Sequence, residues 1–253
     1  MEKSVEFIVN RVMKNNFSMA FESLLQPIFD TSGFTCVGAE MLIRGVHRRA
    51  LVSPDVFINR LEENGGIVSL GEHVISSAFS YMTDVIVPHN GSYLLHLNLS
   101  PVQLNDAGFA DRIVELVAQR PVPVQRIVFE ITDNNILLDD TGRENATRLR
   151  DAGFLLAWDD IHSVEQLQSR LAQVETDFIK LDRACFRATS GEETLNIIRR
   201  AQEKEVDVIA EGVETFSQMQ VLFNSNVRLA QGYLFSRPLN QDSFRQKHLQ
   251  LTE

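Results

Sequence analysis

Acidic, amide and lysine side chains interrupt several apolar runs of this sequence, each near the point where the run ends. Apart from the lysine, all offer oxygen donors, the ligands that hard divalent ions such as Mg²⁺ and Mn²⁺ prefer. Burying unpaired carboxylates around one axis is costly, so such a group requires a positive partner. The interrupting residues are Glu40, Asn98, Glu130, Asp159, Asp160, Lys180, Glu211 and Gln231.

The adjacent pair Asp159-Asp160 narrows the chemistry that we expect. Neighbouring carboxylates at a strand end can flank two ions, and ions about 3.5 to 4 Å apart are the usual device for in-line displacement at phosphorus. Lys180 would then hold the attacking water or stabilise developing charge, and Glu211 would take the proton. Alone, each has a structural explanation, since Asp-Asp before a helix is usually an N-cap and a lone lysine usually extends over apolar surface. Their recurrence at successive strand ends favours the metal site.

The pattern of apolar residues predicts the elements that would carry these side chains. From residue 94 onward, short segments rich in β-branched and aliphatic residues are apolar throughout, which is typical of parallel strands buried on both faces. Helical periods lie between most of them, and this alternation over 253 residues predicts a (β/α)₈ barrel. The predicted strands are 23–29, 36–43, 94–99, 127–131, 154–158, 178–181, 206–210 and 229–234, and the predicted helices are 54–63, 71–87, 107–117, 141–152, 164–172, 192–204 and 215–224.

The first two predicted strands are joined by residues 30–33, Asp-Thr-Ser-Gly, which is too short for a helical crossover. They should pair antiparallel, so the predicted fold class is α/β, a TIM-like (β/α)₈ barrel variant with an antiparallel first strand. Helical spacing in residues 1–14 predicts an amphipathic helix that packs on the domain or on a partner. We therefore expect an N-terminal helical extension at 1–20, a barrel domain at 21–240 and a polar C-terminal tail at 241–253.

Composition limits the class of protein. A hydrophobic content of 44% suits one substantial core, and a net charge of −10 argues against a general nucleic-acid or anionic-membrane binder. The cysteines Cys36 and Cys185 lack C-x-x-C spacing, so we expect a reduced protein without a zinc site. No apolar run approaches the roughly 18 to 20 residues that span a bilayer, and no signal-peptide layout is present. We expect a soluble cytoplasmic protein with no membrane or nucleic-acid polymer as a partner.

In order along the chain, these motifs resemble those of the EAL-domain phosphodiesterases, which act on the bacterial messenger cyclic di-GMP. The resemblance runs from about Phe21 to Leu239, and residues 38–44, Gly-Ala-Glu-Met-Leu-Ile-Arg, resemble the segment with the Glu-Ala-Leu signature. The other matching segments are 25–28, 98–100, 130–132, 159–160, 180–183, 210–215 and 231–238.

The resemblance implies roles for individual residues and a reaction. It implies two Mg²⁺ or Mn²⁺ ions, Lys180 and Glu211 at the attacking water, and hydrolysis of one phosphodiester bond to give linear pGpG. It also implies a homodimer and a place in signalling that controls motility and biofilm formation. The metal ligands that it implies are Glu40, Asn98, Glu130, Asp159 and Asp160. The substrate contacts that it implies are Gln26, Leu42, Arg44, Glu214 and Gln231.

The chain departs from the family in the loop after the paired aspartates. Active members usually have Phe-Gly-Thr-Gly there, whereas residues 161–164 are Ile-His-Ser-Val, and Asp133 replaces a glutamate that supports the loop. Val164 cannot cheaply adopt the positive φ of a glycine, so the loop must follow another path. His162 could be a new ligand, but we favour an exposed loop histidine.

The altered loop leaves two hypotheses. In the first, the protein is a cyclic di-GMP phosphodiesterase that is slow because of its loop. In the alternative, it is a catalytically impaired member that acts as a cyclic di-GMP receptor or a protein-binding regulator of motility, adhesion or transcription. Retention of the whole polar set favours catalysis, because a surface that only binds proteins has no need of metal ligands.

Overall fold

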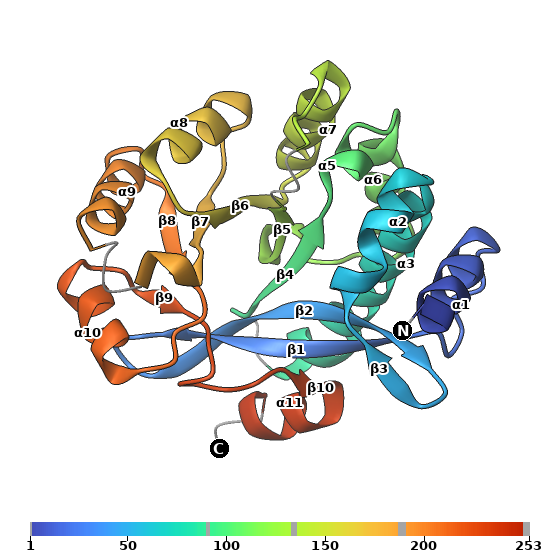
Figure 1. The fold of residues 1–253 in the computed structure, drawn as a ribbon, viewed down its shortest axis with the longest axis horizontal. Coiled ribbons are helices and arrows are strands. Elements are labelled where there is room, and N and C mark those ends of the chain that lie inside the picture. The colour runs from blue at the N-terminus through green and yellow to red at the C-terminus, as the bar shows by residue number, and fades with distance from the viewer. Residues whose placement is uncertain (1, 90–91, 133–135, 187–190, 250–253) are drawn as a thin grey trace.

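The computed structural model describes residues 2–89, 92–132, 136–186 and 191–249, so the expectation for Asp133 lies outside the described residues (Figure 1). Within them, eight strands close into a barrel with helices between the strands. In order around the barrel they are β1 (Phe21–Asp30), β2 (Thr35–His47), β4 (Leu94–Leu99), β5 (Ile127–Ile131), β6 (Leu155–Ile161), β7 (Phe178–Leu181), β8 (Asp207–Ala210) and β9 (Leu229–Ala230).

The direction of the strands confirms the predicted barrel variant. Neighbours from β2 through β9 pair in parallel, whereas β1 pairs antiparallel with both β2 and β9 and so closes the ring. Because parallel strands share one direction, their carboxyl ends open at the same mouth of the barrel.

The main helices lie outside the barrel. They are α2 (Ile58–Glu63), α3 (Gly66–Tyr81), α6 (Phe109–Gln119), α7 (Asp140–Asp151), α8 (Val164–Gln173), α9 (Gly191–Glu203) and α10 (Phe216–Asn224). Shorter helical turns are η1 (Pro54–Val56), α4 (Val87–His89), α5 (Pro101–Leu104), η3 (Val124–Arg126) and η4 (Arg183–Phe186), and a π-helical turn, η2 (Met82–Ile86), follows α3. Among the described residues, no helix is both long enough and apolar enough to cross a bilayer.

Several predicted elements differ in length from those observed, and two of these differences have a local cause. The third helix begins at Gly66 rather than residue 71, because Gly65, with φ at 77°, forms the turn that precedes it. Strand β9 ends at Ala230 rather than residue 234. There the chain turns across the backbone of Val213, and a Cβ on Gly232 would lie 2.3 Å from the Val213 nitrogen. Only glycine fits this close approach.

Short elements flank the barrel at both chain ends. Strand β3 (Ala50–Val52) extends β2 as a hairpin, and β10 (Leu239–Asn240) pairs with β1. Helix α1 (Glu2–Met13) buries Val5, Ile8 and Val12, as the helical spacing predicted. Its Ile8 lies against Gly45 of β2, where a Cβ would come within 2.4 Å. Helix α11 (Gln241–His248) lies in the segment expected as a tail and buries Phe244.

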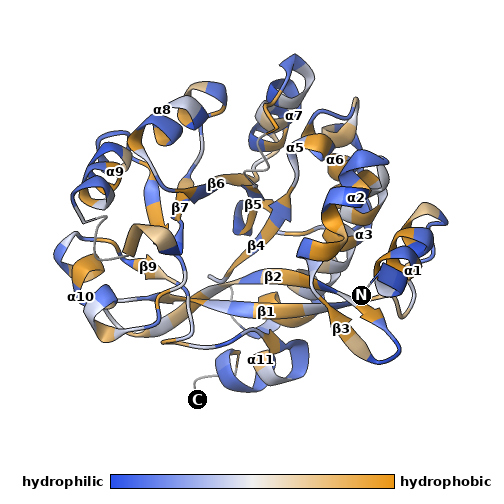
Figure 2. Cartoon of the chain, viewed as in Figure 1, coloured by the Kyte–Doolittle hydropathy of each residue, from blue (hydrophilic) through white to orange (hydrophobic). Residues whose placement is uncertain are grey.

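The core has three parts, of which a small one around Ile8, Leu61 and Leu70 packs α1 against α2 and α3. The largest part lies between strands and helices, and the outer turns of the helices carry mainly hydrophilic residues (Figure 2). Inside the barrel, an apolar plug consists of Ile28, Val128, Ala157, Phe178 and Ile209. Above this plug the interior is polar.

Candidate active site

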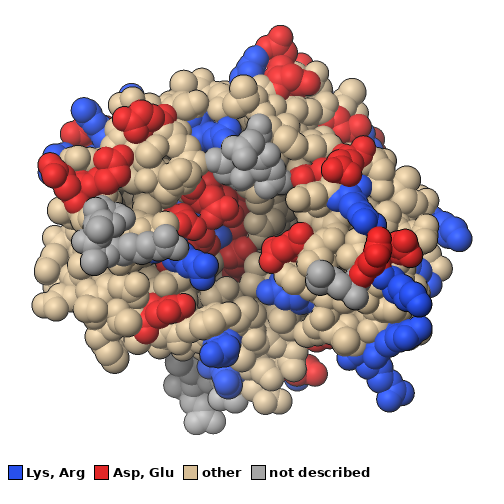
Figure 3. Space-filling view, in the orientation of Figure 1, with Lys and Arg blue, Asp and Glu red and all other residues tan. Residues whose placement is uncertain are grey.

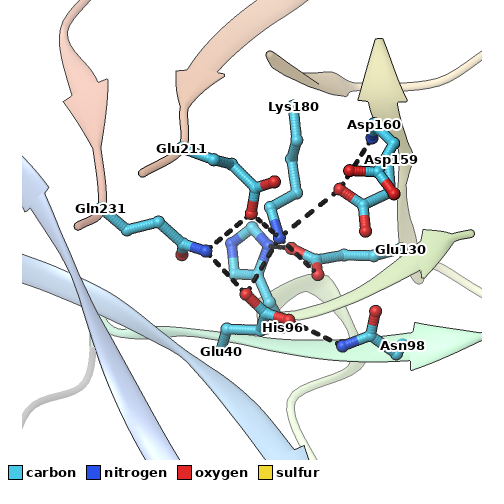
Figure 4. Close-up of polar contacts among 9 residues, drawn as sticks. All are labelled: Glu40, His96, Asn98, Glu130, Asp159, Asp160, Lys180, Glu211 and Gln231. Atoms are coloured by element: carbon cyan, nitrogen blue, oxygen red, sulfur yellow. Dashed lines mark hydrogen bonds and ion pairs between the residues drawn. The ribbon is translucent and has the colours of Figure 1, made fainter. Parts of the chain in front are cut away.

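Lys180 lies at the centre of a carboxylate cluster inside the barrel mouth (Figure 4). It comes from β7 and has 0% of its side chain exposed. Its Nζ lies 2.6 Å from Oε1 of Glu211, 2.8 Å from Oε2 of Glu130 and 3.0 Å from Oε2 of Glu40. Oδ1 of Asp159 is 3.8 Å away. One ammonium group therefore neutralises part of a larger negative charge.

Two amide side chains orient the carboxylates. Gln231, which follows β9, donates from Nε2 to Glu40 and to Glu211, both at 2.7 Å. Asn98 of β4 donates from Nδ2 to the other oxygen of Glu40, at 2.7 Å. Oε1 of Gln231 is buried and has no hydrogen-bond partner among the described residues. A buried carbonyl without a donor indicates that a water or a ligand belongs beside it.

Asp159 and Asp160 lie at a bulge in β6, where the pairing with β7 shifts register. In a regular strand, successive side chains point to opposite faces. Asp160 instead adopts a left-handed backbone with φ at 55°, and its N–H donates to Oδ1 of Asp159 at 2.9 Å. Oxygen atoms of Asp159, Asp160 and Glu211 lie within 4.8 Å of one another, so the strained bulge gathers carboxylates rather than separating them.

The electrostatics of the cluster call for additional positive charge. Burial raises the pKa of Glu211 to about 8, and it raises the pKa of Glu130 and Asp159 as well, although Lys180 acts in the opposite direction. Burial alone would lower the pKa of Lys180, but the surrounding carboxylates hold it well above its usual value. The ammonium stays charged. Burial opposes ionisation of Glu40, but Lys180, Gln231 and Asn98 outweigh it and lower the pKa of Glu40 to about 2, whereas the ammonium does not suffice for Glu130, Asp159 and Glu211. Because all the donors are oxygens, the site fits hard divalent cations.

A cavity of about 340 Å³ opens above the cluster, and Figure 3 shows acidic side chains gathered in this hollow. The predicted substrate residues in its lining are Gln26, Leu42, Glu214 and Gln231. Sequence reasoning did not assign roles to Asp182, Arg183 and Tyr233, which also line it. Arg183 offers a positive charge for an anionic ligand.

Arg44 is not among the lining residues of this cavity. By strand alternation, Arg44 points to the same face of β2 as Glu40 and Leu42. It lies farther along β2, which continues to His47, beyond the part of the strand that lines the cavity. Its Nη1 donates to the carbonyl of the adjacent Ile43 at 2.8 Å.

His96 of β4 is a site residue that sequence reasoning missed. It is 1% exposed, and its Nδ1 lies 2.8 Å from Oε1 of Glu130. Burial lowers the pKa of His96 to about 3, so the ring is neutral. A signal was present in the sequence, because a residue two positions before Asn98 in a strand faces the same side.

The loop after Asp160 is held by capping hydrogen bonds. Ser163 begins α8 as its N-cap, and its Oγ accepts from the Gln166 nitrogen at 3.1 Å. The backbone N–H of His162 donates to Oε1 of Gln166 at 2.9 Å. None of residues 161–164 has positive φ, as expected for a loop without glycines. The His162 side chain is exposed.

Comparison with known proteins gives the family of this chain. Probable cyclic di-GMP phosphodiesterase PdeD of Escherichia coli is 30% identical over 226 residues, which cover 87% of this chain and 42% of PdeD. Cyclic di-GMP phosphodiesterase PdeL of the same organism is 27% identical over 233 residues, which cover 88% of this chain and 64% of PdeL. The chain therefore spans less than two thirds of the length of either relative.

The fold also matches a solved structure, that of the EAL enzyme Bd1971 bound to cAMP and cyclic di-GMP. The TM-score is 0.86 with 24% sequence identity, over 96% of this chain and 68% of that chain. The sequence model of the EAL domain matches residues 10–238, which include the strands of the barrel and every residue of the carboxylate cluster. The chain belongs to the EAL domain family.

Proposed function

We propose that this protein hydrolyses cyclic di-GMP to linear pGpG with the help of two Mg²⁺ or Mn²⁺ ions. The observation that carries the proposal is the convergence of four carboxylates on one buried ammonium, with Asp160 beside two of them, at the floor of an open cavity. The names of PdeD, a probable cyclic di-GMP phosphodiesterase, and of PdeL, a cyclic di-GMP phosphodiesterase, support the choice of substrate.

The proposed metal ligands are Glu40, Asn98, Glu130, Asp159 and Asp160. Glu211 is close enough to Asp159 and Asp160 to share an ion with them. When bound, the ions would polarise the phosphoryl oxygens and lower the pKa of the attacking water. The chain's own residues must hold that water and remove its proton.

Glu211 is the proposed base for the attacking water. Its Oε1 contacts Nζ of Lys180 at 2.6 Å and accepts a hydrogen bond from Nε2 of Gln231 at 2.7 Å, so two partners hold this oxygen at the cavity floor. Lys180 stabilises the negative charge that develops on the phosphate. The unpaired Oε1 of Gln231 can accept a hydrogen bond from the same water.

The proposed substrate contacts are Gln26, Leu42 and Glu214, which line the cavity. Arg44 would have to turn its guanidinium away from the Ile43 carbonyl to grip a phosphate. We also propose that the protein acts as a homodimer, which a measurement of its mass in solution would test.

The test is a turnover assay with cyclic di-GMP and either Mg²⁺ or Mn²⁺, with the product identified by chromatography against authentic pGpG. Wild type and the control His162→Ala, which alters an exposed loop side chain, should release pGpG, and Glu40→Ala should not. Calorimetry in Ca²⁺ measures substrate binding without turnover. A wild type that binds cyclic di-GMP but releases no pGpG with either metal would refute the proposal and leave the receptor hypothesis.

A further inference from the structure

His96 lies between the carboxylate cluster and the apolar plug of the barrel. Its ring centre is 5.9 Å from that of Phe178, which belongs to the plug, and its Nδ1 contacts Glu130 in the cluster (Figure 4). A lumen-facing residue at this depth would ordinarily continue the apolar plug. The Nδ1 edge of the His96 ring instead points toward the barrel mouth, at the carboxylate of Glu130.

The two oxygens of Glu130 have separate partners. Oε1 lies 2.8 Å from Nδ1 of His96, and Oε2 lies 2.8 Å from Nζ of Lys180. Glu130 is 0% exposed, so water cannot replace either partner. The imidazole therefore occupies one oxygen, and the other faces the cluster.

We propose that His96 is a positioning residue that fixes Glu130 as a one-oxygen ligand of a divalent cation, with Oε2 directed to the ion. The inference rests on the proposed function only in that the ion is the one invoked there. It assigns a role to a residue that touches neither the substrate nor the ion.

The physical reason is the hydrogen-bond requirement of a buried carboxylate. An ionised carboxylate can only accept, so the contact at 2.8 Å places a ring proton on Nδ1 of His96. An apolar side chain at position 96 would leave Oε1 without a donor and free Glu130 to rotate. Outer partners of this kind typically contribute about 10- to 100-fold to metal affinity.

The arrangement also has a consequence for ion selectivity. Ca²⁺ accepts both oxygens of a carboxylate, whereas Mg²⁺ and the similar Mn²⁺ favour octahedral sites with single oxygens. By withholding Oε1, His96 disfavours two-oxygen binding by Glu130. Loss of the imidazole should therefore weaken Mn²⁺ binding more than Ca²⁺ binding.

The experiment measures Mn²⁺ and Ca²⁺ dissociation constants by calorimetry for the full chain and three variants. In His96→Asn the amide nitrogen takes the place of Nδ1, and in His96→Gln it lies one methylene farther away, so Asn should preserve the bond and Gln should not. Phe178→Leu is the matched control, because it loosens the packing under the ring without touching Glu130. Thermal melts in EDTA show that each variant folds.

We expect His96→Gln to weaken Mn²⁺ binding by about 10- to 100-fold, with a smaller loss for Ca²⁺, and His96→Asn and Phe178→Leu to stay within about threefold of wild type. The inference would be overturned by equal losses of Mn²⁺ affinity in His96→Asn and His96→Gln, by an unchanged Mn²⁺ affinity in His96→Gln, or by a wild type that binds no Mn²⁺. If Mn²⁺ binding follows the expected order but no pGpG forms, the inference stands and the proposed function fails.

A second measurement does not depend on whether the variants fold. Nitrogen NMR of wild-type protein with ¹⁵N-labelled histidine reports which ring nitrogen carries the proton. The inference requires a proton on Nδ1, and a ring protonated only at Nε2 would overturn it.

Discussion

The backbone N–H of Val164, in the loop after the paired aspartates, donates to Oε1 of Glu193 at 2.9 Å. Glu193 lies in the first turns of α9, whereas Val164 is the first residue of α8. A carboxylate at the start of a helix satisfies free N–H groups and interacts favourably with the helix dipole. One helix thus supports the loop that leads into its neighbour.

Glu193→Ala should loosen this loop. We expect a loss of about 1 kcal/mol in the free energy of unfolding, as for loss of a helix cap, and faster amide hydrogen exchange in residues 161–166. The exposed neighbour Glu192→Ala is the control for a lost charge on the same helix. Equal exchange rates in the two variants would show that the Val164 contact does not hold the loop.

Divalent ions should stabilise the folded protein. At 100 times the dissociation constant, Mg²⁺ or Mn²⁺ adds about 2.7 kcal/mol by mass action, which corresponds to roughly 5 to 10 °C in Tm for a chain of this size. Asp159→Asn and Asp160→Asn should lose most of this shift, and each should raise Tm in EDTA because one repelling carboxylate is gone. Asp151→Asn, at the exposed end of α7, should behave as wild type. Scanning fluorimetry with and without the ions measures both effects, and an equal shift in all variants would place the ions elsewhere.

Lys180→Met should destabilise the protein strongly in the absence of metal. The substitution keeps the length of the side chain but leaves Glu40, Glu130 and Glu211 buried without their ammonium partner. Removal of one partner from such a network costs about 3 to 5 kcal/mol. Urea unfolding in EDTA measures the loss, added Mg²⁺ should recover part of it, and the exposed Lys204→Met should cost little. A Lys180→Met protein as stable as wild type in EDTA would contradict the central role of the ammonium.

The two cysteines should resist alkylation in the folded protein. Burial raises the pKa of both Cys36 and Cys185 from the usual value of 9.0 to about 11, so little thiolate is present at neutral pH. The alkylation rate should rise about tenfold per pH unit up to about pH 11, and in urea it should level off near pH 9. The same raised pKa favours folding below pH 9, and this contribution disappears as the pH rises through 11. Iodoacetamide kinetics measure the difference, and equal rates with and without urea at pH 8 would refute it.

The parts of the fold that could be predicted are those that follow from local pattern. Continuous apolar runs predicted the parallel strands, and the short link between β1 and β2 predicted that these two strands pair antiparallel. The early end of β9 could not be foreseen, since it depends on the close approach of Gly232 to Val213 from another strand end. The π-helical turn after Tyr81 likewise has no pattern of its own in the sequence.

In the candidate site, too, local pattern could be predicted from the sequence, and contacts between distant residues could not. Strand ends and motif order identified Glu40, Lys180 and Glu211, and the structure brings these residues together. The contact between Glu193 and Val164 joins residues 29 positions apart on separate helices, which no local pattern reveals. Arg44 is not among the residues that line the cavity, because alternation predicts the face of a strand and not how far along it the barrel mouth lies; its contact with substrate stays a prediction.

The antiparallel strand that closes the barrel also constrains how the protein is made. Phe29 of β1 pairs with Ala230 of β9, so the first strand of the barrel must wait until the last strand of the barrel has emerged from the ribosome. Until then β1 has only β2 as a barrel neighbour, and its other edge stays open to unintended pairing. Contacts this distant in sequence form slowly. Closure of the barrel should therefore be the late, rate-limiting event in biosynthesis, and nascent chains stalled before residue 229 should be the ones that recruit chaperones.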